Sequence, residues 1–574
     1  MVGPRCDHLL QFFRPHAGIS SCRGRGRHTI AEKQVAWECY RLNGADEHDE
    51  WKRVLSACFE LPGPYLFDAT THHLRVWDPR RPSVRAPGSE VVCRDGFHIE
   101  RVAFGATDDA TDIGISPARL AFEPGSRLPS KLPANVLFSK GHQPPVLRNG
   151  EMITQIHPLV EFLNAHLGDN RLEPRTDYTV HNSGSAVAYL FADTSVPLTS
   201  LLAGSGFRIN LLNMVKSARA KEPVPVHLGV LPTEPHLEQP GLQAGQEIAR
   251  ILSGWGCQTV LAILRDEARV NRFVADQSRG KAVILVPLRG KKGEPPPEHS
   301  MAWLKALNER NAAFQLCSTE SNLAYSRHGL ATVILGKAGG TLFRAEPEAV
   351  AGYREAWFVG LDLGLGGKHT GKVVAIVLTD SNGRLIAHWR ARKGNDETLS
   401  VETLSEGLAW VVNEAEARRP GQHYYLIRDG VRPHNESLEL YLRAMAGCEF
   451  TLIEYAKSGV PFMHREGTQP EPGTTILPAN SRWAALYPCQ APQRGVFTTP
   501  AKFAVPINPR NHTLSEVASV LTALCHAATL SFEASRLPAP IQWADGLAEI
   551  SYSNLQFSGW AHVPRQLIPV RTTR

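Results

Sequence analysis

The feature that most constrains the fold is an alternation of short apolar runs and helix-period segments that begins near residue 222. Continuous apolar runs at 226–231, 259–264 and 281–288 have the length of buried strands, and segments with helical spacing separate them. Strands that are apolar on both faces are typical of a parallel sheet with helices on each side. The pattern therefore predicts one Rossmann-like α/β domain over residues 222–345.

A second α/β unit is expected over residues 346–574. Its second and third strands are joined by Asp380-Ser381-Asn382-Gly383, and Asn-Gly tolerates the positive φ angles of a tight hairpin. The unit therefore begins with a three-stranded meander. Strands are predicted at 357–363, 373–378, 385–391, 424–427 and 451–455, and helices at 401–417, 437–446, 514–530 and 540–550.

Residues 1–221 are harder to interpret, and we expect an α+β lobe with a helix at 158–167. The 62 Lys and Arg residues outnumber the 56 Asp and Glu residues slightly, a balance that permits nucleic-acid binding without requiring it. The ten cysteines form no C-x-x-C pair, which is typical of reduced thiols in the cytoplasm. No segment has the length and apolarity of a signal peptide or membrane span, so we expect a cytoplasmic protein.

Three aspartates stand where apolar elements open toward expected clefts. Asp362 lies in the strand GLDLG, Asp429 ends the strand of LIRDG, and Asp545 lies in PIQWADGLAEI at the expected start of the last helix. A single aspartate is more often a cap or turn residue, but a charge in a buried strand is costly unless it is paired or binds a cation. Clustered carboxylates bind hard divalent cations, and two such ions can promote phosphodiester hydrolysis.

The segments WFVGLDLG, LIRDGVRPHNE, FTLIEYAKSG and LPAPIQWADGLAEI, in this order, resemble the PIWI domain of Argonaute proteins, most closely the prokaryotic members. The resemblance covers roughly residues 222–574 and implies a guide-binding MID domain at 222–345 and an RNase H-like PIWI nuclease domain at 346–574. Because the lobe at 1–221 is shorter than a complete N–L1–PAZ–L2 array, we expect the PAZ domain to be absent or reduced.

The resemblance also implies a catalytic tetrad. Asp362, Asp429 and Asp545 match the three metal-binding aspartates of the family, which would hold two Mg²⁺ or Mn²⁺ ions. The fourth member is a glutamate on the segment after the third strand, and Glu397 in KGNDETLSVETLSEGL fits this position best. Glu402 in the same segment remains an alternative.

The family's MID domain holds the 5′ end of the guide, and the resemblance implies a site for it here. Its predicted residues are Lys305, Gln315, Lys337, Lys457 and the C-terminal Arg574. Met301 departs from the pattern, because an aromatic or basic residue is expected there. A lysine on a helix is also often an ordinary solvated residue, so both interpretations of Lys305 stay open.

Together these residues predict a monomeric, guide-directed endonuclease that binds a short guide, cleaves the complementary target strand, and acts in host defence against plasmids or phages. DNA and RNA stay open for both strands, as do a 5′-phosphate and a 5′-hydroxyl on the guide. The alternatives are a non-cleaving guide-binding module that recruits an effector, and a guide-independent nuclease or transposase-like enzyme. Residues 364–368 (GLGGK) lack the spacing of a nucleotide-binding phosphate loop, and Ser458 lacks a G-x-S-x-G frame.

Overall fold

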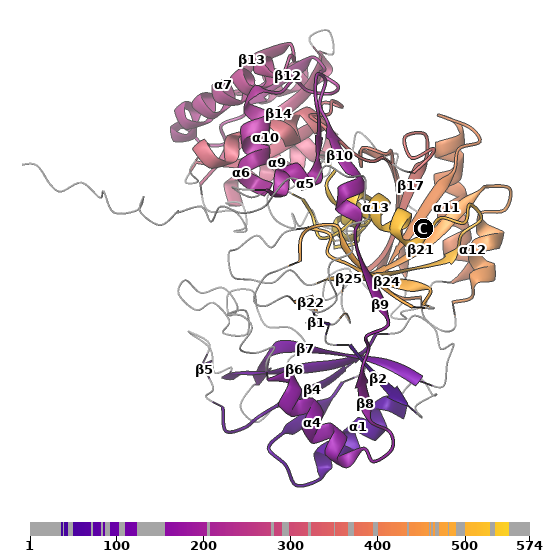
Figure 1. Ribbon diagram of the computed structural model, residues 1–574. Helices are drawn as coiled ribbons and strands as arrows, with labels where there is room; N and C mark the ends of the chain where they lie inside the picture. The colour runs from indigo at the N-terminus through magenta and orange to yellow at the C-terminus, as the bar shows by residue number, and fades with distance from the viewer. Residues whose placement is uncertain are drawn as a thin grey trace, which may run out of the picture.

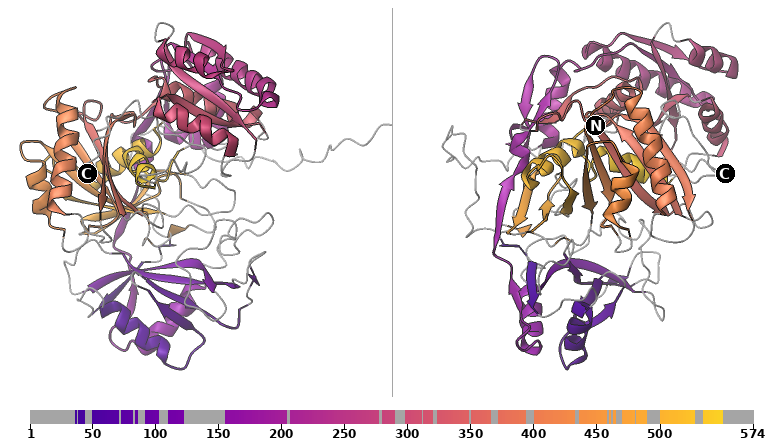
Figure 2. Two further views of the ribbon diagram at one scale, coloured as in Figure 1. Left: turned by 180° about the vertical axis from the view of Figure 1, so that it is seen from behind. Right: turned by 90° about the vertical axis from the view of Figure 1, so that its right-hand side faces the viewer.

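A computed structural model shows the chain as three regions arranged one above another, with a parallel sheet at one end, a large mixed sheet in the middle and an antiparallel sheet at the other end (Figures 1 and 2). The structure describes residues 36–549 except for 38, 44–49, 71–72, 82–83, 86–91, 103–109, 123–154, 204–206, 277–279, 290–297, 311, 320–322, 349, 366–371, 394–399, 433–435, 458–459, 461–462, 465–469, 480, 490–499 and 528–533.

The N-terminal region is an antiparallel sheet with helices packed on it (Figure 1). Its elements are β2 (Cys39–Asn43), α1 (Glu50–Glu60), β3 (Leu66–Ala69), β4 (His73–Trp77), β5 (Val84–Arg85), β6 (Val92–Arg101), β7 (Ala110–Phe122), α4 (Ile156–His166) and β8 (Leu172–Pro174). The strands follow the order β3-β4-β6-β7-β2-β8, and β5 pairs with β6. Leu55, Ile99 and Leu159 belong to the core that joins the sheet to both helices. This confirms the predicted α+β character and the helix expected at 158–167.

A connecting segment runs from this region along the middle one to the parallel sheet (Figure 1). Its first strand joins the middle sheet, and its second belongs to a three-stranded antiparallel sheet of order β11-β10-β16. The elements are β9 (Tyr178–Asn182), the short 3-10 helix η3 (Ser183–Ala186), β10 (Val187–Leu190), β11 (Ser195–Pro197), α5 (Leu198–Leu202), α6 (Phe207–Ser217) and, from later in the chain, β16 (Arg344–Pro347).

The four-stranded parallel sheet is covered by helices on both faces. Its elements are β12 (Val226–Val230), the 3-10 helix η4 (Pro235–Leu237), α7 (Glu238–Gly254), β13 (Thr259–Ile263), α8 (Glu267–Ala275), β14 (Lys281–Leu288), α9 (Glu298–Glu309), β15 (Ala313–Ser318) and α10 (Leu323–Lys337). The strand order is β13-β12-β14-β15. Val283 and Leu285 share a core with α7 and α10, whereas Ile284 and Val286 share one with α8 and α9. Both faces are therefore buried, which explains the continuous apolar runs.

The middle region is a nine-stranded mixed sheet of order β19-β18-β17-β20-β21-β25-β24-β23-β9. Its remaining strands are β17 (Trp357–Leu365), β18 (Lys372–Thr379), β19 (Leu385–Lys393), β20 (Tyr424–Asp429), β21 (Phe450–Ala456), β23 (Thr474–Pro478), β24 (Trp483–Leu486) and β25 (Ala501–Ile507). Strands β17, β20 and β21 run parallel, and the other neighbours are antiparallel. The short strands β1 (Ala36–Trp37) and β22 (Met463–His464) pair with each other.

Helices cover both faces of this sheet: α11 (Val401–Glu416), α12 (Leu438–Ala444), α13 (Leu514–Cys525) and α14 (Ala539–Glu549). Alternate residues of β17 face them, because Val359 shares a core with α11 and α12 whereas Phe358 shares one with α13. Helix α14 begins at Ala539, so Asp545 lies inside the helix and not at its start as predicted.

The predicted fold class, a Rossmann-like sheet followed by a mixed sheet and preceded by an α+β lobe, is confirmed. Helix α13 ends at Cys525, five residues before the end expected from the apolar spacing. Within the part of the chain that the structure describes, no helix has both the length and the apolarity to cross a bilayer.

Candidate active site

Two glycines of β17 allow helix α14 to approach the sheet closely. Gly360, Asp362 and Gly364 are spaced two residues apart along the strand and therefore lie on the same face of the sheet. A Cβ at Gly360 would lie 2.2 Å from the carbonyl oxygen of Pro540, and one at Gly364 would lie 2.5 Å from the Cβ of Ala548. Helix α14 and strand β17 thus run side by side between these two contacts. The distance from one contact to the other is roughly 12–13 Å along either element. Asp545 lies between the two contact points and is carried to Asp362.

Parallel pairing of β17 with β20 positions the second carboxylate. The register places Leu361 opposite Arg428, so the next residues, Asp362 and Asp429, also lie side by side on neighbouring strands. Gly430 follows with a φ of +79°, a left-handed conformation that ends the strand directly after the aspartate. The β20 strand and its turn therefore hold Asp429 beside Asp362.

The three aspartates converge into one cluster. Carboxylate oxygens of Asp362, Asp429 and Asp545 lie within 4.8 Å of one another, and Asp362 is the buried member. The ammonium group of Lys457, directly after β21, lies 3.0 Å from Oδ2 of Asp429 and 2.8 Å from Oδ1 of Asp545. The cluster thus combines three acidic side chains with one lysine as their internal counter-charge.

Burial and mutual repulsion both act on the protonation of this cluster. Burial, and then the charges of Asp429 and Asp545, raise the pKa of Asp362 to about 7, although Lys457 opposes the shift. Burial acts to lower the pKa of Lys457, but the charges of Asp429 and Asp545 and their hydrogen bonds outweigh it, so the pKa is raised. The site is therefore built to attract a cation, because three carboxylates share one ammonium.

A buried ion pair holds the loop that follows Asp429. Nε of Arg428 donates to Oε1 of Glu436 at 3.0 Å, and the guanidinium also donates to the carbonyl oxygens of Asp429, Gly430 and Val431. Both members of the pair are almost fully buried. Arg428 and Glu436 were not among the predicted site residues, although a charged residue within the apolar strand LIRDG is the signal that could have identified Arg428.

The predicted fourth carboxylate is not described by the structure. Glu397 belongs to residues 394–399, which lie outside the described part of the chain. The alternative, Glu402, is exposed in the first turn of α11, and among the described residues the carboxylate cluster contains aspartates only. The choice between Glu397 and Glu402 stays a prediction.

Two of the residues predicted to bind the guide's 5′ end lie together at the parallel sheet. Gln315 is buried in β15, and Lys337 is partly buried at the end of α10. Nζ of Lys337 donates to Oε1 of Gln315 at 2.9 Å and to the carbonyl oxygen of Phe314. Burial lowers the pKa of Lys337 to about 7. A partly desolvated lysine beside an amide can bind an anion, which would restore its charge.

The other predicted guide-binding residues lie elsewhere. Lys305 is exposed on α9, and Met301 on the same helix packs partly buried against the core beneath it. Lys457 contacts Asp429 and Asp545 of the carboxylate cluster. Arg574 lies outside the described residues.

Comparison with known proteins identifies the fold. No protein-family model and no curated protein sequence matches the chain. Several solved structures, however, match the chain. Drosophila Piwi is 14% identical with a TM-score of 0.60, covering 87% of this chain and 82% of its own.

Marinitoga piezophila Argonaute, crystallised with a 5′-hydroxyl guide RNA and target DNA, is 11% identical with a TM-score of 0.59, covering 90% of this chain and 86% of its own. Kluyveromyces polysporus Argonaute with a guide RNA is 12% identical with a TM-score of 0.56, covering 86% and 77%. The chain therefore has the fold of Argonaute and Piwi structures over most of its length.

Proposed function

We propose that the protein is a guide-directed endonuclease, which binds a short nucleic-acid guide and hydrolyses a phosphodiester bond of the complementary strand. The observation that carries this proposal is the convergence of Asp362, Asp429 and Asp545 from two strands and a helix onto one point of the nine-stranded sheet. Neighbouring carboxylates repel one another, and burying one of them adds a further cost, so a cluster that includes a buried member is a functional-site candidate.

The donor set suits Mg²⁺ or Mn²⁺. All three side chains offer carboxylate oxygens, the ligands that hard divalent cations prefer. The ammonium of Lys457, within 3.0 Å of Asp429 and Asp545, is already a cation at this place. Two bound ions would activate a water molecule and stabilise the leaving oxygen. Asp362, Asp429 and Asp545 would hold them.

The chain's own groups have further tasks in this proposal. With a pKa of about 7, Asp362 is partly protonated at neutral pH. Its carboxylate becomes fully ionised, and so available to bind a cation, as the pH rises above that value. Arg428 and Glu436 keep the loop after Asp429 in place. Glu397 would add the fourth carboxylate when the target strand is paired, and cleavage would leave a 3′-hydroxyl and a 5′-phosphate.

Guide binding is proposed for the site around Gln315 and Lys337, where an anionic 5′ end would accept hydrogen bonds from a lysine whose partners among the described residues are neutral. Lys305, Lys457 and Arg574 are proposed as further contacts. Base pairing would supply sequence specificity while the protein contacts the backbone. The nucleic-acid complexes of the Marinitoga and Kluyveromyces proteins support a nucleic-acid ligand for this fold.

The proposed division is an N-terminal lobe at 1–221 with an absent or reduced PAZ domain, a MID domain at 222–345 and a PIWI domain at 346–574. A monomeric state, a cytoplasmic location and host defence against plasmids or phages complete the proposal, and they rest on the resemblance of the motifs. The PAZ part fails if an experimental structure shows a complete oligonucleotide-binding PAZ barrel.

A cleavage assay tests the proposed activity. Protein would be loaded with DNA or RNA guides of about twenty nucleotides, carrying a 5′-phosphate or 5′-hydroxyl, and given a labelled complementary target with Mn²⁺ or Mg²⁺. We expect one cut at a fixed distance from the guide's 5′ end. Asp429→Ala should reduce the rate by at least about a thousandfold, because it removes several kcal/mol of metal-dependent stabilisation.

The matched control is Asp193→Ala, which changes an exposed aspartate in the connecting segment and should leave cleavage intact. Undiminished cleavage by Asp429→Ala would refute the assignment. Tight guide binding without cutting under any condition would favour the alternative, a guide-binding module that recruits an effector. The contacts of Lys457 with two of the three aspartates are the observation that supports this alternative.

A further inference from the structure

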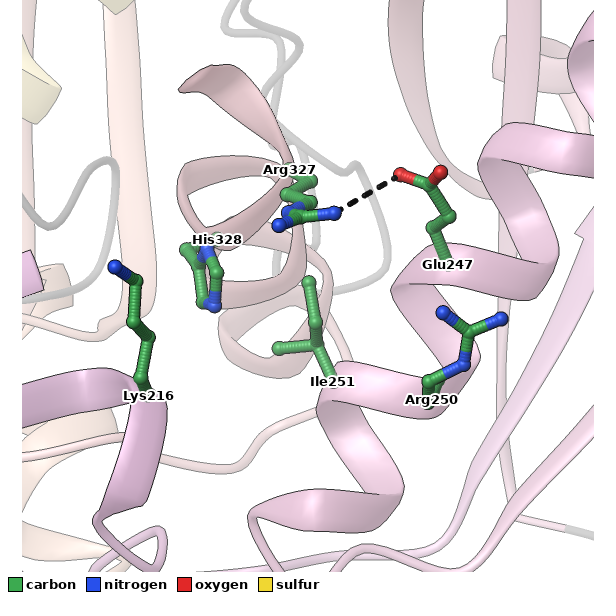
Figure 3. A pocket seen from close by; sticks show the side chains of 6 residues that line it. All are labelled: Lys216, Glu247, Arg250, Ile251, Arg327 and His328. Atoms are coloured by element: carbon green, nitrogen blue, oxygen red, sulfur yellow. Dashed lines mark ion pairs between the residues drawn. The ribbon is translucent and has the colours of Figure 1, made fainter. Parts of the chain in front are cut away.

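A small pocket lies between helices α6, α7 and α10, on the helical layer of the parallel sheet (Figure 3). Its volume is about 210 Å³, and its lining residues are Lys216 from α6, Glu247, Arg250 and Ile251 from α7, and Arg327 and His328 from α10. Figure 3 shows Arg327 and His328 in the middle, with Lys216 on one side of them and Glu247 and Arg250 on the other, and Arg327 directed toward Glu247. None of these residues takes part in the function proposed above.

The pocket has an excess of positive charge. Lys216, Arg250 and Arg327 are cationic, whereas Glu247 is the single carboxylate among the lining residues. Glu247 forms an ion pair with Arg327, in which Oε2 of Glu247 lies 3.7 Å from Nη1 of Arg327. The charges of Lys216 on α6 and Arg250 on α7, both exposed side chains, are therefore not neutralised by Glu247. Three cationic side chains with one carboxylate along the same pocket give it a positive potential, which favours an anionic ligand.

Two buried nitrogen atoms of the pocket residues have no hydrogen-bond partner among the described residues: Nε of Arg327 and Nδ1 of His328. His328 is 7% exposed, so this nitrogen is removed from bulk water. Buried polar atoms in native proteins are almost always paired, so each of these nitrogens needs an acceptor or a donor that the described part of the chain does not supply. Burial, Arg327 and Lys216 also lower the pKa of His328, a sign of the local positive potential.

The pocket is distinct from the proposed guide-end site. Arg327 lies near the start of α10 and Lys337 at its end, ten residues later, which corresponds to about 15 Å along the helix axis. The two groups also differ in partners, because Lys337 is already bound to Gln315 and Phe314. A ligand in the pocket would therefore not occupy the same position as the guide's 5′ end.

We propose that this pocket binds a phosphate group. A phosphate offers several acceptor oxygens to guanidinium and ammonium donors that approach from different directions, and arginine is well suited to hold it through paired hydrogen bonds. The volume is smaller than the roughly 300–1,000 Å³ of pockets that enclose drug-sized ligands, so a phosphate with a sugar-sized substituent fits better than a dinucleotide. The side chain of Ile251 provides an apolar wall for such a substituent.

Calorimetric titration of the full-length protein at low salt tests the proposal. The ligands would be inorganic phosphate, ribose 5-phosphate and, as the uncharged control, ribose. A second arm would use a short oligonucleotide with and without a terminal phosphate, which separates a small phosphorylated molecule from a strand end as the source. We expect binding that requires the phosphate and weakens as ionic strength rises.

Variants identify the site. Arg250→Gln and Lys216→Gln change exposed helix positions, so the protein should fold, and each should weaken phosphate binding on the order of tenfold. Arg272→Gln on α8 is the matched control, because it removes an exposed arginine from the opposite helical layer. Lys337→Gln should weaken only phosphate binding at the proposed guide-end site, so the binding that remains in this variant is the binding at the pocket. Absence of phosphate-dependent binding, equal loss in Arg272→Gln, or loss only in Lys337→Gln would overturn the proposal.

Discussion

Lys457 and Lys337 are both partly buried lysines beside a sheet, yet their surroundings shift them in opposite directions. Lys457 faces Asp429 and Asp545, whose charges keep it protonated and raise its pKa. Lys337 faces the amide oxygen of Gln315 and a backbone carbonyl, which do not offset the cost of burial, so its pKa falls to about 7. Burial acts to lower the pKa of both lysines, and charged partners outweigh it only at Lys457.

The contrast assigns different roles to the two lysines. Lys337 has no anionic partner in these contacts, so an anionic ligand would gain its full charge and its hydrogen bonds. Lys457 already neutralises part of the carboxylate cluster and must compete with any metal ion that Asp429 and Asp545 bind. Lys337 is therefore available to bind an anion, whereas the ammonium of Lys457 lies where a metal ion would bind.

Among variants that test the contrast between the two lysines, the largest effect is expected on guide binding. Lys337→Gln should weaken binding of the preferred guide by roughly 30-fold, since a charged hydrogen bond to the 5′ end is lost. Binding of Mn²⁺ should not change, because Lys337 is not part of the carboxylate cluster. Fluorescence anisotropy with labelled guides and titration with Mn²⁺ measure the two quantities.

The matched control for this variant is Lys305→Gln, which removes an exposed lysine of the same region. Its effect on guide affinity should be several times smaller, because an exposed lysine gains less from an ion pair. Equal losses in the two variants would show that the partly buried lysine has no special part in guide binding.

A smaller effect is expected at the carboxylate cluster. Lys457→Met removes the competing ammonium, so Mn²⁺ should bind on the order of tenfold more tightly. The metal-free protein should at the same time have a lower Tm, because three carboxylates are left without their counter-charge. Titration calorimetry and thermal melts in the presence of a chelator would check both results.

Lys457→Arg retains the positive charge and should resemble the parent protein in both measurements. An unchanged Mn²⁺ affinity in Lys457→Met would contradict competition between Lys457 and a bound cation, since it would mean that this lysine does not hold the aspartates in solution.

The smallest effect concerns stability. The native pKa of Asp362 is about 7 against an ordinary value of 3.8, so the native state binds more protons than the unfolded state between these values. The contribution of Asp362 is present at low pH and is lost as the pH rises through about 7. Asp362→Asn should therefore stabilise the metal-free protein by about 1–2 kcal/mol at pH 8, with the gain shrinking toward pH 4.

Chemical denaturation at several pH values in the presence of a chelator measures this difference. Asp193→Asn, at an exposed position, is the control and should follow the parent protein. A constant difference between Asp362→Asn and the parent across the pH range would contradict a raised pKa for Asp362.

Much of the local structure followed from periodicity. The apolar run at 281–288 is β14, and the Asn-Gly hairpin is present, with Gly383 at a φ of +71° and the carboxylate of Asp380 accepting from the backbone of Asn382. The helix predicted at 401–417 is α11, which ends one residue earlier. Such patterns are predictable because they depend on neighbours in sequence and on which face of an element is buried.

The sequence by itself determined the alternation of strands and helices, the order of the three aspartates and the resemblance that links them. Only the tertiary structure decided that Gly360 and Gly364 let α14 carry Asp545 to Asp362, and that Lys457 lies among the carboxylates. It also decided that Lys216, Arg250 and Arg327 share one pocket. These contacts join residues far apart in the chain, so packing and strand register set them, and no local pattern encodes them.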